Sequence, residues 1–288
     1  MKAPRIMLAA GRSGSGKTMI TCGLLRALQQ MGKQPAAFKC GPDYIDPMFH
    51  REVLGVDSKN LDLFFSEEDI LKEGYLKHTK DADITITEGV MGFYDGMSLD
   101  SVKGSSYDVA QTLGLPVILV INARGAAMTL AAVVKGIAEF RPDSNIRGIL
   151  LNRVSAMLYP RLKEMLENEL ARIGHDEIKI VGYMPENEAF HLESRHLGLV
   201  TPQEMENLQE KVRQAGEILA KTVDLELLEK IAGEAAVWKT EVIEESEKVG
   251  NLKSKNDPVR IAVARDEAFC FYYKDNLCLL YTSDAADE

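Results

Sequence analysis

The sequence predicts an α/β fold in which helices cover both faces of a parallel β-sheet. Two observations predict it. Short apolar segments, each long enough for a buried strand, alternate along the chain with longer segments whose apolar residues recur at helical spacing. A glycine-rich loop also joins the first such strand to the first helix. Because crossovers between parallel strands are right-handed, the loops that follow the strands should meet at one edge of the sheet.

The glycine-rich loop runs from Gly11 to Thr18 and fits the P-loop pattern, GxxxxGK followed by Ser or Thr. The apolar residues 6–10 before it predict a strand, and residues 19–31 after it predict a helix. Backbone N–H groups of such a loop surround a phosphate, while Lys17 can reach the outer phosphates and the Thr18 hydroxyl can hold Mg²⁺. The nucleotide-binding residues predicted in this loop are Gly11, Ser13, Gly14, Ser15, Gly16, Lys17 and Thr18.

The remaining elements follow the same alternation. Further strands are predicted at residues 34–39, 83–87, 116–121, 146–151 and 178–183. Further helices are predicted at residues 66–80, with Ser66 as the N-cap, and at residues 105–113, 126–140, 158–173, 202–222 and 224–231. Between residues 41 and 47, two prolines and a glycine predict an irregular loop.

Polar side chains follow several of these strands at the edge where ligands bind in such sheets. Asp43 and Asp46 lie three residues apart after the second predicted strand, and Glu88 directly follows the third. An acid placed after a strand beside a P-loop is typical of Mg²⁺ binding in phosphoryl transfer. Lys39 lies at the end of the second strand. The residues expected in one cleft with the P-loop are Asp43, Asp46, Glu88, Asp95 and Asn152.

The composition argues against nucleic acid or an anionic membrane as the main partner. The 288 residues carry a formal net charge of −10, whereas phosphate backbones select basic surfaces. The cysteines form no CxxC pair, and with neither a signal peptide nor a membrane-spanning apolar run apparent, we expect a cytoplasmic protein with reduced thiols. The histidines without ligand spacing, which we expect at the surface or in loops, are His50, His78, His175 and His191.

The C-terminal part predicts a change of organisation after about residue 235. Residues 236–257 are rich in Glu and Lys and predict a solvated linker. Residues 259–264 are apolar again and predict a strand, as expected where a second domain begins at residues 258–277. Residues 278–288 match no element, and we expect them to be a non-native tail in place of a longer natural sequence.

Four segments together resemble the cobyrinate a,c-diamide synthase family, the glutamine-dependent, ATP-driven amidases of corrin synthesis. They are Gly11 to Thr18, Phe38 to Pro47, Thr87 to Gly96 and Arg195 to Leu199. The resemblance covers about residues 5–277. It implies a P-loop NTPase domain similar to dethiobiotin synthetase at residues 1–235, followed by the first strand of a truncated class I glutaminase-like domain. No residue of this chain matches the glutaminase nucleophile or histidine.

The resemblance implies that ATP phosphorylates the a and c carboxylates of cobyrinic acid, and that ammonia from glutamine then replaces each phosphate, in cobalamin biosynthesis. It implies Mg²⁺ bound by Thr18, Asp46 and Glu88. The catalytic residues that it implies are Lys17, Lys39, Asp43, Asp46, Glu88 and Asp95. Substrate contacts are expected from Tyr44, Asp95 and Arg195, and adenine contacts from Asn152 and Pro185.

Two alternatives stay open at this stage. A related tetrapyrrole, hydrogenobyrinate or nickel-sirohydrochlorin, presents the same carboxylate chemistry. A P-loop partition or assembly ATPase would instead use ATP as a switch, and its pattern expects a second lysine early in the P-loop, where this chain has Arg12 and Ser13. The expected partners are ATP, a tetrapyrrole, and glutamine or ammonia, with the oligomeric state left open.

Overall fold

The computed structural model describes residues 4–187, 208–238, 260–266, 269–273 and 276–277. The chain divides into two compact units, one of Lys2–Ala236 and the other of Val237–Glu288 with Met1. The first unit contains the sheet and the helices described below. In the second unit, the described residues 260–264 form no strand, contrary to the prediction. A strand needs a neighbouring strand for its backbone hydrogen bonds, and the described residues of this unit provide none.

Seven parallel strands form one sheet in the described residues, in the order β3-β2-β4-β1-β5-β6-β7. Their bounds are β1 (Arg5–Ala10), β2 (Pro35–Cys40), β3 (Ser58–Leu61), β4 (Ile84–Glu88), β5 (Val117–Asn122), β6 (Ile146–Asn152) and β7 (Lys179–Met184). Strands β1 and β4 are buried along their whole length, as expected where helices cover both faces of a parallel sheet. This arrangement confirms the predicted fold class.

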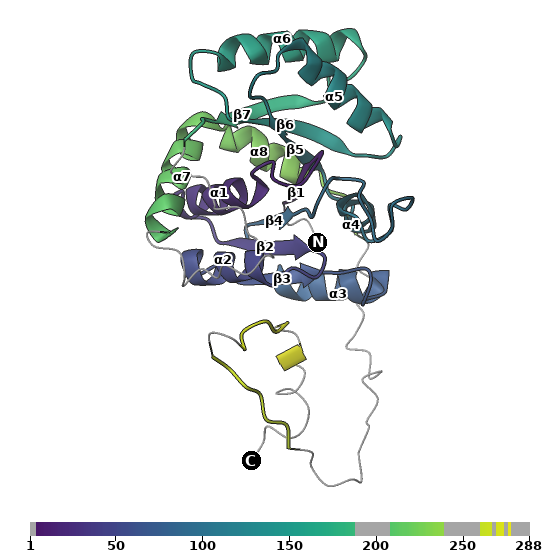
Figure 1. Ribbon diagram of the computed structural model, residues 1–288, viewed down its shortest axis with the longest axis vertical. Coiled ribbons are helices and arrows are strands. Elements are labelled where there is room, and N and C mark those ends of the chain that lie inside the picture. The colour runs from purple at the N-terminus through teal and green to yellow at the C-terminus, as the bar shows by residue number, and fades with distance from the viewer. Residues whose placement is uncertain (1–3, 188–207, 239–259, 267–268, 274–275, 278–288) are drawn as a thin grey trace. The chain divides into compact units, whose positions relative to one another are not determined.

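Helices lie on both faces of this sheet. Their bounds are α1 (Lys17–Gln30), α2 (Ile45–Leu54), α3 (Glu68–His78), α4 (Ser106–Leu113), α5 (Met128–Glu139), α6 (Tyr159–Arg172), α7 (Leu208–Thr222) and α8 (Leu225–Gly233). Figure 1 shows α1 and α7 on the left of the strands and α4 on the right. Helices α1 and α7 pack closely because Gly23 faces Leu219 and Ala215, where a Cβ atom would lie 2.6 Å from the Leu219 side chain.

The structure corrects the prediction between residues 41 and 61. Helix α2 begins at Ile45, where we expected a loop to continue to Pro47. Pro47 is tolerated because the first turn of a helix needs no N–H donor there. The Asp43 carboxylate accepts hydrogen bonds from the N–H groups of Ile45, at 2.9 Å, and Asp46, at 3.1 Å, and so caps the helix. Strand β3 was also not predicted, because it is short and largely polar.

Other boundaries differ by a few residues. Helix α3 begins at Glu68 with Glu67 as its N-cap, so Ser66 does not cap it as predicted. Glu88 and Asn152 are the last residues of β4 and β6 and do not follow these strands. Three predicted segments lie wholly or partly outside the described residues: residues 202–207 of the helix predicted at 202–222, residues 239–257 of the predicted linker, and the tail at 278–288.

Candidate active site

The P-loop connects β1 to α1 at the centre of the sheet, and two of its glycines have a left-handed backbone. Gly14 has φ 72° and Gly16 has φ 90°. A Cβ atom on Gly16 would lie 2.3 Å from Nδ2 of Asn152, so the position excludes any larger residue. The Asn152 amide donates a hydrogen bond of 2.8 Å to the carbonyl of Ser15. The end of β6 therefore holds the loop from the side, and Asn152 lies beside the P-loop as predicted.

Lys17 points from the start of α1 to the loop after β4. Its ammonium group donates a hydrogen bond of 2.7 Å to the carbonyl of Met91, whose backbone is left-handed at φ 46°. Burial lowers the pKa of Lys17, and the nearby Lys39 ammonium lowers it further. A buried ammonium group with one carbonyl partner is well suited to an incoming anion, which would supply the missing negative charge.

A buried ionic cluster lies beside the P-loop, on the carboxyl ends of β2 and β4. We call Lys39, Asp46, Glu88 and Thr18 the ionic cluster. The Lys39 ammonium lies 2.5 Å from Asp46 Oδ2 and 3.0 Å from Glu88 Oε1. The Thr18 hydroxyl donates to Glu88 Oε1 at 2.7 Å and lies 3.3 Å from Asp46 Oδ2. The structure therefore brings together the three residues that the sequence predicted as metal ligands, Thr18, Asp46 and Glu88. The Lys39 ammonium lies between the two carboxylates.

The buried charged groups of the ionic cluster shift one another's pKa values. Burial alone would raise the pKa of Glu88, but the Lys39 ammonium, the nearby His50 ring and the hydrogen bond from Thr18 hold that pKa well below its usual range. The pKa of Asp46 is raised, first by burial and then by the Glu88 charge, more than Lys39 lowers it. Although burial lowers it, the pKa of Lys39 is raised by Asp46, Glu88 and Asp43.

This donor set fits a magnesium ion held together with a nucleotide. Two buried carboxylates and one hydroxyl offer hard oxygen donors, and Asp43 adds a third negative charge 3.8 Å from Lys39. Within the part of the chain that the structure describes, no group of three or more His, Cys, Asp or Glu side chains could hold a metal alone. A P-loop site does not need such a group, because Mg²⁺ is shared there between one or two carboxylates, water and the phosphates.

His50 is a residue of the site that the sequence analysis missed. We predicted a surface or loop position, but its side chain is fully buried on α2. Its Nδ1 atom lies 2.9 Å from the Ser58 hydroxyl, and its Nε2 atom lies 3.7 Å from Glu88 Oε2. The available signal was its spacing, since His50 lies four residues after Asp46 and thus on the same face of a helix. That signal needed α2 to be recognised first.

The other predicted site residues that the structure describes lie outside the ionic cluster. Asp95 is exposed in the loop after β4, where its carboxylate accepts a hydrogen bond of 2.9 Å from the N–H of Gly92. Tyr44 is half-buried and directly precedes α2. Gly11 and Ser13 are exposed parts of the P-loop. Arg195 lies outside the described residues.

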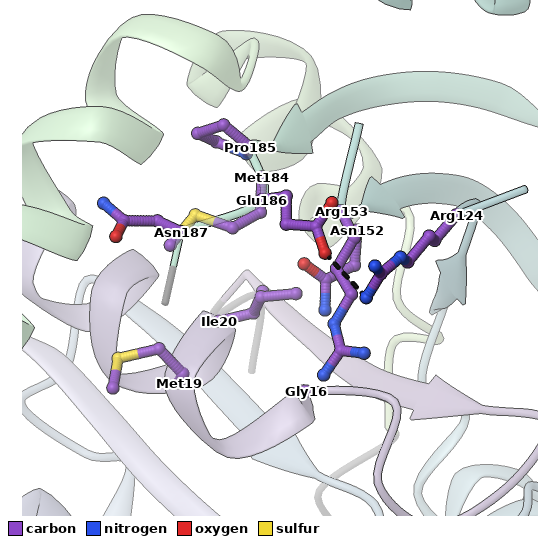
Figure 2. A pocket seen from close by; sticks show the side chains of 10 residues that line it. All are labelled: Gly16, Met19, Ile20, Arg124, Asn152, Arg153, Met184, Pro185, Glu186 and Asn187. Atoms are coloured by element: carbon purple, nitrogen blue, oxygen red, sulfur yellow. Dashed lines mark ion pairs between the residues drawn. The ribbon is translucent and has the colours of Figure 1, made fainter. Parts of the chain in front are cut away.

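A pocket of about 230 Å³ opens next to the start of α1. Figure 2 shows the side chains around it, which come from α1, from the ends of β6 and β7 and from the loop after β5. Arg124 and Glu186 form an ion pair of 3.0 Å at its rim. The predicted adenine-binding residues Asn152 and Pro185 both line it, as does Gly16 of the predicted P-loop. The sequence analysis did not name Arg124, Arg153 or Glu186 as site residues. The lining residues are Gly16, Met19, Ile20, Arg124, Asn152, Arg153, Met184, Pro185, Glu186 and Asn187.

Comparison of the sequence with known proteins identifies the family of this chain. Residues 6–200 match the family described as CobQ/CobB/MinD/ParA nucleotide binding domain. The chain belongs to this family. It is 41% identical over 276 residues to a cobyrinate a,c-diamide synthase of Clostridium acetobutylicum, with 96% of this chain and 59% of that protein covered. It is 40% identical to the corresponding protein of Clostridium tetani, with 96% and 58% covered. The resemblance predicted from the motifs is thereby confirmed.

The chain spans less than two thirds of the length of these relatives. Among solved structures, chloroplast FtsY from Physcomitrella patens matches with a TM-score of 0.47 at 12% identity, over 75% of this chain and 65% of that one. Within the described residues, no helix is both long and apolar enough to cross a membrane.

Proposed function

We propose that this chain carries the ATP-dependent synthetase part of a cobyrinate a,c-diamide synthase. It activates the a and c carboxylates of cobyrinic acid with ATP, so that ammonia derived from glutamine can convert each into a carboxamide. The observation that carries the proposal is the ionic cluster beside the P-loop. The chain that holds it is 41% identical in sequence to a cobyrinate a,c-diamide synthase.

The chemistry divides into two balanced steps. First, a carboxylate oxygen of the corrin attacks the γ-phosphorus of ATP, the bond to the β-phosphate oxygen breaks, and ADP leaves. Ammonia then attacks the carbonyl carbon of the acyl phosphate, phosphate leaves with its bonding electrons, and the nitrogen loses a proton. The first step brings two anions together, so it needs charge neutralisation and positioning more than covalent help.

The residues of the site match these needs. Lys17 and Lys39 place two ammonium groups beside the loop that holds the phosphates. The residues that would hold Mg²⁺ are Thr18, Asp46 and Glu88. When bound, this ion supplies positive charge to the β- and γ-phosphates. The pocket lined by Asn152 and Pro185 supports adenine binding on the other side of the P-loop.

A second pocket offers aromatic side chains to a large, flat substrate. It has a volume of about 430 Å³ and lies between the loop after β3 and residues that follow β4, on the same edge of the sheet as the P-loop. Phe64 and Phe65 are exposed there, with ring centroids 4.8 Å apart, and Lys103 lines the same pocket. Apolar rings suit the flat macrocycle of a tetrapyrrole, and Lys103 can pair with one of its carboxylates. The same pocket is also lined by Glu67, Glu68 and Asp108, so its charge does not favour the other carboxylates of such a substrate.

The test is ATP turnover by the purified chain with a high concentration of ammonium, with and without cobyrinic acid, followed by mass spectrometry of the corrin. We expect ADP release that the corrin stimulates, together with the small mass decrease of a carboxylate that becomes a carboxamide. ATP hydrolysis that is indifferent to every tetrapyrrole would contradict the proposal and favour a switch ATPase. Hydrogenobyrinic acid and nickel-sirohydrochlorin serve as competing substrates in the same assay.

Two variants test the metal ligands. Asp46→Asn and Glu88→Gln keep the shape of the side chain and remove its charge, so each should lower ATP turnover about 100-fold or more. Glu73→Gln, on the outer face of α3, is the matched control and should leave turnover unchanged. Near-normal turnover in both site variants would refute the metal assignment.

A further inference from the structure

His50 and Asp46 both face Glu88 from α2. They lie four residues apart, so their side chains leave the helix on the same face one turn from each other. Both are buried, and Glu88 between them is fully buried. Asp46 shares Lys39 and Thr18 with one oxygen of Glu88, Oε1. The other oxygen, Oε2, faces Nε2 of His50 at 3.7 Å.

Glu88 Oε2 and His50 Nε2 are buried atoms without a hydrogen-bond partner within normal distance in the described residues. A buried polar atom left unpaired costs about 1–3 kcal/mol, so two such atoms that face each other indicate a functional pairing. The other nitrogen of the ring, Nδ1, is held by the Ser58 hydroxyl of β3 at 2.9 Å. The ring is thus anchored at one end and directed at the carboxylate with the other.

We propose that His50 is a positioning residue for Glu88, with the Ser58 hydroxyl holding the other nitrogen of its ring. The inference rests on the proposed function, in which Glu88 Oε1 serves the metal. By drawing Oε2 toward α2, the N–H of His50 keeps the carboxylate plane turned so that Oε1 faces Thr18 and Lys39. Without that contact the Glu88 side chain can rotate about its last bond and divide its two oxygens between the same partners.

The tautomer follows from the surrounding atoms. Glu88 Oε2 offers only lone pairs, so Nε2 must carry hydrogen to interact favourably with it. In a neutral ring Nδ1 then has a lone pair, which accepts the proton of the Ser58 hydroxyl. The opposite tautomer would set the Nε2 lone pair against a carboxylate oxygen in a buried site. Glu88 therefore selects the Nε2–H form, and the Ser58 hydroxyl, which can donate or accept, fits that form by donating to Nδ1.

The first test measures the free protein. In ¹⁵N-histidine-labelled protein, the His50 ring should show the chemical shifts of the Nε2–H tautomer, with Nδ1 as an acceptor, and the signal is assigned by its loss in His50→Gln. Replacing Ser58 by Ala removes the hydrogen bond to Nδ1 and should shift the Nδ1 resonance, while Nε2 keeps its hydrogen. A ring that carries its hydrogen on Nδ1 alone would overturn the proposal. This readout needs no ligand, so it is independent of whether the proposed reaction occurs.

The second test measures metal binding directly, with Mn²⁺ and ADP as the probe and electron paramagnetic resonance as the readout. Loss of a partner that orients a metal ligand typically costs about 10- to 100-fold in metal affinity, and we expect that loss for His50→Ala. His50→Gln can still donate an N–H toward Glu88 and should recover much of the affinity. His175→Ala, which removes a histidine paired with Glu139 and Glu177 at the surface, is the matched control.

The outcomes separate positioning from a merely structural role. Thermal unfolding identifies variants that do not fold. If His50→Ala is one of them, the Mn²⁺ affinity is measured on Ser58→Ala instead, which loses only a hydroxyl. A folded His50→Ala with unchanged Mn²⁺ affinity would overturn the proposal, as would equal losses in the Gln and Ala variants. If His50→Ala lowers the Mn²⁺ affinity and His50→Gln recovers it, but no tetrapyrrole is amidated, the proposed substrate is wrong and the role of His50 stands.

Discussion

Lys39→Met tests how the ionic cluster is stabilised. The substitution keeps an unbranched apolar side chain of similar length but removes the ammonium that lies 2.5 Å from Asp46 and 3.0 Å from Glu88. The Lys39 side chain is only 5% exposed, and Glu88 not at all, so water cannot replace the lost charge. Breaking a buried ion pair on one side costs about 3–5 kcal/mol. In a domain of this size, that loss lowers the melting temperature by about 6–20 °C.

The pH dependence gives the sharper test. In the natural chain Lys39 holds the pKa of Glu88 low, so Glu88 contributes stability above its unfolded pKa of about 4.3, and this is lost as the pH falls through the lower folded pKa. Without Lys39, burial raises the pKa values of Glu88 and Asp46 above their unfolded values, and their charged forms become destabilising as the pH rises. The free energy of unfolding of Lys39→Met should therefore fall further below that of the unsubstituted protein as the pH rises from acidic to neutral. We call this difference the stability deficit.

Urea denaturation of both proteins at pH 5 and pH 8 measures this deficit. Mg²⁺ should narrow it, because a cation at the carboxylates replaces the lost ammonium. Lys77→Met is the control, since that side chain is 75% exposed and its partner Glu73 is 3.6 Å away, and it should change stability little. A deficit for Lys39→Met that is absent, or that is the same at both pH values, would refute the account of the ionic cluster.

Three further predictions concern the nucleotide site and its surroundings. Gly16→Ala should abolish binding of a fluorescent ATP analogue and cost at least about 1–2 kcal/mol of stability, because its φ of 90° and the nearby Asn152 amide both oppose a Cβ atom. Asn152→Ala, which loses the hydrogen bond to Ser15 and one wall of the pocket, should raise the KM for ATP about tenfold with little change in kcat; an effect on kcat alone would contradict this. Burial raises the pKa of Cys40 to about 12, so iodoacetamide at pH 8 should leave it unlabelled in the native protein, and rapid labelling would show that β2 is accessible.

Much of the fold follows from periodicity and loop chemistry in the sequence. Strands such as β5 are continuous apolar segments between turn residues, and helices such as α4 begin at a side chain that caps them, here Ser105. Both signals are local, so they can be recognised without knowing the fold. The meeting of Thr18, Asp46 and Glu88 also followed from the sequence, because parallel strands bring their carboxyl ends to one edge.

What could not be predicted depends on contacts between distant segments. The pocket beside α1 includes Arg124 and Arg153, which come from different loops and have no motif to identify them. Strand β3 is a short edge strand, which among the described residues pairs with β2 alone, and its polar residues give no apolar alternation. In the second unit, an apolar segment at residues 260–264 looked like a strand, but apolar content alone does not provide a pairing partner.

The overlooked helix α2 matters most for the site. Its start signal was present in Asp43, which caps it, and its end signal in Gly55, whose φ of 65° suits a helix C-terminus. A proline in the first turn hid both signals. Once α2 is a helix, Asp46 and His50 necessarily share one face, and that face meets Glu88 on β4. An irregular loop could bring Asp46 to the P-loop, but only a helix fixes a second residue, one turn later, on the other oxygen of the same carboxylate. The buried position of His50 therefore follows from the same turn of helix that places Asp46.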